Sequence, residues 1–261
     1  MINKSKRYWL NMIVFALVLA VVFGIWYIPY HRSEKLIKYI EKQDAGTVEE
    51  MLRSGVDPNV PTGPYEGGWK YWNTLLENAP KTPLAVACRT GNLEIVELLL
   101  SYGASPVLTQ HEDLDWSALS ATLFYFQPDD VEIVKLLLEN GVDPDCDEYF
   151  GEMPVFMAAS MTPKVYDATK ANGTVFASEY DESTAKGITE IVLLLLGDES
   201  VNVTTPSGQS LLMLAAKKGN RYLVNALMEK GCDKTMVDTY GKTALDYAKE
   251  GENQEVIDLL H

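Results

Sequence analysis

The chain is poor in the residues from which catalytic and metal sites are built. Its 261 residues include only three cysteines and three histidines, whereas a structural zinc site takes four ligands. Three cysteines without paired spacing indicate no disulfide framework. His31, His111 and His261 are far apart and leave a serine or cysteine nucleophile without an evident base. Nucleotide-binding, nucleophile-elbow and zinc-peptidase motifs do not occur. We therefore expect no enzyme, no cofactor, no metal site and no small-molecule substrate.

Positive charge is scarce as well. The sequence has 22 lysines and arginines against 37 aspartates and glutamates, a net charge of −15, and no acid precedes Glu34. A body this acidic repels phosphates, so we expect no nucleic-acid partner. The charge favours a protein partner with a basic surface. The alternative, that the acids mainly provide solubility, stays open.

Charged residues are absent from one N-terminal stretch, residues 8–30. As a helix it would be about 34 Å long, enough for a hydrocarbon core of about 30 Å. It predicts a transmembrane signal anchor, preceded by a basic tail at residues 1–7. By the positive-inside rule the tail is cytoplasmic, and the rest of a single-pass membrane protein is periplasmic or extracellular. A cleaved signal peptide is the alternative.

The remaining sequence repeats itself. Apolar segments that end in glycine, or are cut short by the chain end, recur at residues 47–55, 95–103, 133–141, 191–197, 223–231 and 256–261. A second short apolar element precedes each of them after the first, and Thr82, Ser117, Ser210 and Thr243 are suited to cap it. Each unit predicts two short helices joined by a tight turn. Such helices are too short to be stable alone, so stability must come from stacking neighbouring units.

This pattern resembles the ankyrin repeat family, whose signature is T-P-L-H-x-A. The best matches are KTPLAVACRTGNLEIVELLLSYGASP at residues 81–106 and GKTALDYAKEGENQEVIDLL at residues 241–260. The resemblance implies an all-α ankyrin-repeat solenoid of about six units over residues 33–261, with finger loops between the helix pairs. It also implies a surface for binding other proteins. The signature histidine is absent, so hydrogen bonds between repeats through it should be lost; its positions hold Ala85, Ser120, Phe156, Met213 and Asp246.

Two insertions interrupt the repeats, at about residues 58–80 and 162–186. The first is rich in aromatic residues, which either anchor a partner or cover the first repeat. The second predicts a mobile loop or short hairpin, either functional or merely tolerated. The fingers combine acids with aromatic residues, as if to form an acidic groove with aromatic anchors for a basic partner; a solvated rim is the alternative. The predicted contact residues are Tyr65, Trp69, Tyr71, Trp72, Asp113, Asp115, Trp116, Asp147, Glu148, Tyr149, Phe150 and Tyr240, with Asp238 beside the last.

The functional hypothesis is a non-enzymatic protein–protein interaction module tethered to the membrane. The resemblance suggests a sharper version, an immunity protein that neutralises a toxin outside the cytoplasm. The alternative is a scaffold or accessory subunit for a resident envelope enzyme or complex.

Overall fold

The computed structural model of the protein describes residues 28–60, 82–107, 117–123, 126–144, 153–161, 164–166, 174–176, 181–197 and 200–261. Within these residues twelve helices form six consecutive pairs. The first helices of the pairs are α2 (Ile28–Glu41), α4 (Pro83–Thr90), α6 (Ala118–Thr122), α8 (Pro154–Ser160), α10 (Leu211–Lys218) and α12 (Ala244–Glu250). The second helices are α3 (Ala45–Arg53), α5 (Leu93–Ser101), α7 (Asp130–Glu139), α9 (Glu182–Leu196), α11 (Arg221–Glu229) and α13 (Gln254–Leu260).

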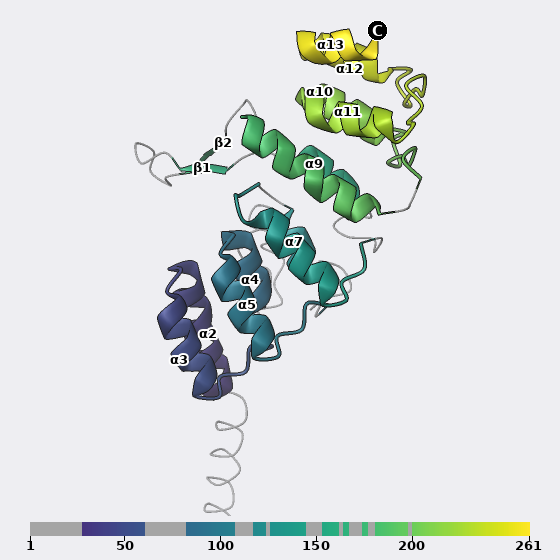
Figure 1. Cartoon of the computed structure of the whole chain (residues 1–261). Helices are drawn as coiled ribbons and strands as arrows, with labels where there is room; N and C mark the ends of the chain where they lie inside the picture. Colours follow the sequence, from purple (N-terminus) through teal and green to yellow (C-terminus); the bar gives the residue numbers. More distant parts are fainter. Residues whose placement is uncertain are drawn as a thin grey trace, which may run out of the picture.

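The pairs stack into two parallel rows. Each first helix contacts the first helix of the next pair, and each second helix contacts the next second helix. We call these the inner row and the outer row. Figure 1 shows the pairs following one another along a bent column from α2 and α3 to α12 and α13. The predicted all-helical repeat array is confirmed. The first pair is complete, because α2 supplies the partner of α3 that the sequence pattern did not reveal.

The predicted transmembrane helix is corrected. Over the described residues, no helix is long and apolar enough to cross a bilayer. The longest, α9 and α2, have 15 and 14 residues and reach only about 21–23 Å against a hydrocarbon core of about 30 Å. Helix α2 begins inside the predicted span at Ile28 and belongs to the first repeat; residues 1–27 lie outside the described residues. On this finding the signal anchor, the single-pass membrane location and the periplasmic or extracellular placement are wrong.

Short polar residues start most of the helices, as the sequence predicts for Thr82. The Thr82 hydroxyl oxygen accepts a hydrogen bond from the Ala85 amide at 3.1 Å, and Asn92 caps α5 by accepting from the Ile95 amide at 3.1 Å. Each cap satisfies a backbone donor that the helix itself leaves unpaired. Gly91 joins these two helices with a φ of +65°, a backbone conformation that other residues adopt only with strain.

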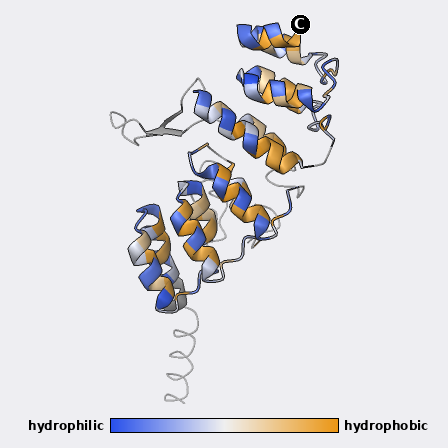
Figure 2. Ribbon diagram, in the orientation of Figure 1, coloured by the Kyte–Doolittle hydropathy of each residue, from blue (hydrophilic) through white to orange (hydrophobic). Residues whose placement is uncertain are grey.

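The core lies between the two rows. Leu99 and Leu137 of the outer row are fully buried, and Figure 2 shows the apolar helix faces turned toward neighbouring helices, with polar faces outward. Ala87, Cys88 and Ala215 are also fully buried and let the inner helices approach closely. Burial raises the pKa of the Cys88 thiol to about 12. The thiol is therefore protonated at neutral pH and fills space as a small apolar side chain.

Side-chain amides at the helix turns link successive pairs. Gln127 donates from Nε2 to the Arg89 carbonyl at 3.0 Å, Asn220 donates from Nδ2 to the Ala185 carbonyl at 3.1 Å, and Asn253 donates likewise to Ala216 at 3.2 Å. At one signature-histidine position, Asp246 bonds within its own pair and accepts a hydrogen bond from the Thr243 amide at 2.9 Å. These amides supply bonds between repeats without any histidine.

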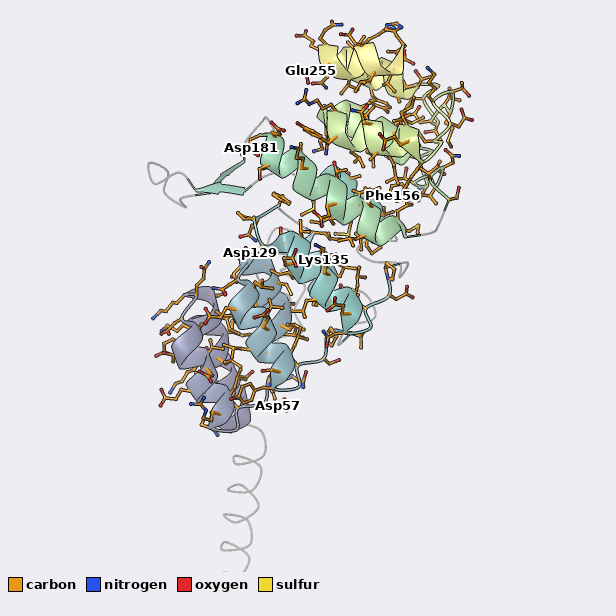
Figure 3. The ribbon with its side chains drawn as sticks, viewed as in Figure 1. Asp57, Asp129, Lys135, Phe156, Asp181 and Glu255 are labelled. Atoms are coloured by element: carbon orange, nitrogen blue, oxygen red, sulfur yellow. The ribbon has the colours of Figure 1, made fainter. Side chains whose placement is uncertain are left out.

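The second insertion contains a short hairpin. Strand β1 (Lys164–Tyr166) pairs antiparallel with β2 (Thr174–Phe176), with Val165 opposite Val175. The hairpin projects on the side away from the loop between α11 and α12 (Figure 1). Helix α9 starts before the predicted end of the insertion at residue 186, because Asp181 caps it by accepting from the Thr184 amide at 2.7 Å. Figure 3 labels Asp181 at this helix start.

Candidate protein-binding surface

Most of the predicted contact residues cannot be placed. Outside the described residues lie Tyr65, Trp69, Tyr71, Trp72, Asp113, Asp115, Trp116, Asp147, Glu148, Tyr149 and Phe150. Their role in an acidic groove stays a prediction. Tyr240 is described, and it lies in the loop between α11 and α12. We call residues 233–243 the terminal finger and residues 200–210 the preceding finger.

The two fingers are bonded to each other. The Thr239 amide donates to the Ser207 carbonyl at 3.1 Å, and the Asp233 amide donates to Asn202 Oδ1 at 2.8 Å. Gly208 has a φ of +77°, and a Cβ there would lie 3.3 Å from the Asp238 Cα. A glycine is therefore needed at this close approach. The fingers form a fixed ledge on the helix pairs rather than two separate loops.

Asp238 holds the terminal finger from inside. Its Oδ1 accepts from the amides of Tyr240 and Lys242 at 2.9 and 3.0 Å, and its Oδ2 accepts from the Tyr247 hydroxyl at 2.6 Å. The Tyr247 oxygen in turn accepts from Gln209 Nε2 at 2.8 Å. Only 6% of Asp238 is exposed. The sequence interpretation placed Asp238 in a partner-facing acidic groove, whereas its carboxylate is turned inward and used within the loop.

These bonds present an exposed apolar tip. Tyr240 is 77% exposed and Val237 is 57% exposed, although the backbone between them is fixed through Asp238. A rigid loop that presents an aromatic ring suits a protein interface, because little conformational freedom is lost when a partner packs on it. Tyr240 is thus exposed on the terminal finger, and its contact with a partner stays a prediction.

Several lysines lie beside the terminal finger. The ammonium groups of Lys217 and Lys242 lie 5.8 and 5.3 Å from the centre of the Tyr247 ring, and Lys242 also pairs with Glu250 at 2.7 Å. Lys218 is half-buried, and its pKa is lowered by burial and by the neighbouring Lys217. Sequence reasoning missed this basic surface because the lysines of α10 and of the finger are far apart in the chain.

The Asp238–Tyr247 hydrogen bond should make the stability of the terminal finger depend on pH. The bond lowers the pKa of Asp238 and raises that of Tyr247. The stabilisation from Asp238 is therefore present above the unfolded carboxyl pKa of about 4 and is lost as the pH falls through its folded pKa; that from Tyr247 is lost as the pH rises beyond about 10. We expect Tyr247→Phe to remove the tyrosine effect, to weaken the Asp238 effect, which keeps its two amide bonds, and to speed amide exchange in the terminal finger roughly tenfold at neutral pH.

Hydrogen–deuterium exchange followed by mass spectrometry measures this change. Tyr222→Phe is the control, because that tyrosine lies outside the finger network. Equal exchange in wild-type protein and Tyr247→Phe would show that the bond does not hold the loop.

The described helices of the outer row carry shallow clefts between them. One cleft of about 420 Å³ lies between α9 and α11 and is lined by Lys186, Thr189, Glu190, Leu193, Leu194 and Tyr222. Its lysine pairs with Glu182 at 2.7 Å and its glutamate with Lys135 at 2.8 Å. Across the described residues no group of acids, cysteines and histidines could hold a metal ion.

Known proteins share this architecture. A chain in the solved complex of Bd0816, a predatory endopeptidase from Bdellovibrio bacteriovorus, with the immunity protein Bd3460 superposes with a TM-score of 0.58. It is 24% identical, and the match covers 86% of this chain and 95% of that one. At this identity the likeness shows a shared fold.

Curated relatives match parts of the sequence. The ankyrin repeat protein FPV230 of fowlpox virus is 28% identical over 128 residues, which are 45% of this chain and 68% of that protein. The zinc finger CCCH domain-containing protein 24 of rice is 34% identical over 120 residues, 46% of this chain but only 15% of that protein. The family model for ankyrin repeats in three copies matches residues 36–148 and 182–261. Because this match spans well over half of the sequence, the chain belongs to the ankyrin repeat family.

Proposed function

We propose that the protein acts by binding another protein, without catalysis of its own, and that it serves as an immunity protein that neutralises a toxin. Ankyrin repeats form protein–protein interaction modules, and the observation that carries the proposal is the rigid terminal finger with its exposed Tyr240 ring. The toxin-specific version draws support from the fold shared with a chain of the endopeptidase–immunity protein complex.

The predicted basic surface of the partner rests on acids in the other fingers, Asp113, Asp115, Asp147 and Glu148. These residues lie outside the described part of the chain. A basic partner surface opposite them remains part of the proposal for that portion of the array.

Binding should depend on Tyr240. We expect Tyr240→Ala to weaken partner binding roughly tenfold or more, because truncation of a central aromatic anchor commonly costs about 2 kcal/mol. Tyr102→Ala is the matched control, since Tyr102 is 38% exposed at the end of α5, far from the terminal finger. The full-length tagged chain is used to capture its partner, and the affinity of each variant is then measured by calorimetry.

The same purified pair separates an immunity protein from a scaffold. An immunity protein should abolish the activity of the bound toxin, whereas a scaffold should leave its bound enzyme active. Full affinity of a folded Tyr240→Ala variant would contradict the proposed surface.

A further inference from the structure

Three lysines of this acidic protein lie at the end of one inner helix and just before the next. Lys217 and Lys218 end α10, and Lys242 precedes α12. Lys217 and Lys242 lie over the same Tyr247 ring, at 5.8 and 5.3 Å from its centre. Two successive repeats therefore direct ammonium groups to one aromatic side chain. We call Lys217, Lys218 and Lys242 the basic cluster.

The positive charge of this cluster is only partly balanced by nearby carboxylates, because Asp238 and Glu250 both act on Lys242. Glu250 pairs with Lys242 at 2.7 Å, but within the described residues no carboxylate forms an ion pair with Lys217 or Lys218. The lowered pKa of Lys218, caused by burial and by Lys217, shows that its charge is unfavourable where it stands. An incoming anion would relieve this repulsion, and it would act where water screens the charges less than on an open surface.

Two cations of the outer row are held by carboxylates. Lys135 bonds to both Glu132 and Glu190, at 2.9 and 2.8 Å, and Arg221 pairs with Glu255 at 3.1 Å. Two adjacent lysines without an ion pair, on a chain whose net charge is −15, thus differ from these paired cations of α7 and α11. Their position beside the terminal finger is a local property of the candidate surface.

Asp238 joins the basic cluster to the apolar tip. One of its carboxylate oxygens holds the Tyr240 amide and the other holds the Tyr247 hydroxyl. The exposed ring of Tyr240 and the lysines around Tyr247 thus border the same carboxylate. A ligand that reaches both would combine negative charge with an apolar side chain.

We propose that the terminal finger and the basic cluster together recognise an acidic segment of the partner protein that carries an aromatic residue. This inference rests on the proposed function, binding of a protein, and adds the chemistry of the recognised segment. It also reverses, at this end of the array, the expectation of a basic partner surface. Aspartates and glutamates of the segment would meet Lys217 and Lys218, and its aromatic residue would pack on Tyr240 and Val237.

The probe for this inference is a fluorescein-labelled peptide of eight glutamates around one tryptophan, titrated into the full-length chain. We expect binding that weakens with salt, and a dissociation constant roughly five- to tenfold higher for Lys217→Glu. Lys217→Gln should show a smaller loss. Lys249→Glu is the matched control, because Lys249 is also exposed in the last turn of an inner helix, makes the same charge change and does not lie over Tyr247.

Each outcome is decisive. No binding of the acidic peptide, equal losses for Lys217→Glu and Lys249→Glu, or equal binding of a lysine peptide or of an oligonucleotide of the same charge would overturn the inference. If the captured partner binds Lys217→Glu as tightly as wild type but loses affinity for Tyr240→Ala, the proposed function stands and this inference fails. If neither variant affects the partner, both fail.

Discussion

Replacement of Leu137 by alanine is expected to lower the free energy of unfolding by about 2–5 kcal/mol. Leu137 is fully buried in α7, and α7 packs against both α5 and α9 in the outer row. Truncation leaves a cavity that the surrounding helices can close only in part, so the loss includes missing contacts as well as lost apolar burial. Urea unfolding followed by far-ultraviolet circular dichroism measures the change.

The adjacent Leu138 provides the control. It is partly buried on the same helix, so Leu138→Ala should cost about 1 kcal/mol or less. In a stacked array each pair contacts only its neighbours. When a middle pair is destabilised, the two ends of the array can unfold separately instead of in one cooperative step. We therefore expect the Leu137→Ala transition to broaden or split, while that of Leu138→Ala keeps its shape. Equal losses for the two variants would contradict the assignment of Leu137 to the core.

The helix pairs could be predicted because their signals are local. A threonine or serine starts a helix, a glycine ends it, and the apolar residues between them repeat. Thr82 starts α4 as predicted and Gly91 ends it, while Asn92, which the sequence analysis did not single out, starts α5. Such signals survive even though the signature histidine is missing from every repeat.

Helix α2 was missed for a physical reason. The uncharged N-terminal run leads into it without a break, so hydrophobicity alone gives no boundary at Ile28. Its helical character as part of the first repeat comes from contact with α3 and α4. Leu36 and Ile40 are fully buried, and that burial depends on neighbours whose position the local sequence does not encode.

The side-chain hydrogen bonds between distant residues could not be predicted from the sequence either. The bond from Asn220 to the Ala185 carbonyl joins residues 35 positions apart, and that from Tyr247 to Asp238 depends on the turn of the terminal finger. The residue types predicted a polar loop with an aromatic side chain, but not that the Asp238 carboxylate would be turned inward. Only the structure distinguishes the exposed Tyr240 side chain, a candidate contact, from the buried Asp238 side chain.

The joint between the third and fourth pairs gives the second large prediction. A Cβ built on Gly187 of α9 would lie 2.4 Å from Cζ and 2.7 Å from Cε2 of Phe126, and the Phe126 ring is only 7% exposed. The salt bridge from Lys135 of α7, labelled in Figure 3, to Glu190 of α9 crosses the same joint at 2.8 Å. An added methyl group must therefore displace either the ring or α9.

We expect Gly187→Ala to lower the free energy of unfolding by about 1–2 kcal/mol. Overpacking in a buried contact costs about 1–3 kcal/mol, and alanine recovers up to about 1 kcal/mol of helix propensity over glycine. Gly46→Ala is the control: Gly46 also lies in a helix, α3, and the nearest atom to a Cβ there is 3.8 Å away, so this change should stabilise the protein. Thermal and urea unfolding of both variants measure the difference.

A double-mutant cycle with Phe126→Leu isolates the contact. The smaller side chain should remove the collision, so that Gly187→Ala becomes neutral or stabilising in that background. A loss of the same size in both backgrounds would mean that the cost arises elsewhere in α9. This joint sets how the first three pairs meet the last three. The single variant should therefore also lower the affinity for any partner that contacts both halves of the array. The affinity for a partner that contacts only the terminal finger should be unchanged.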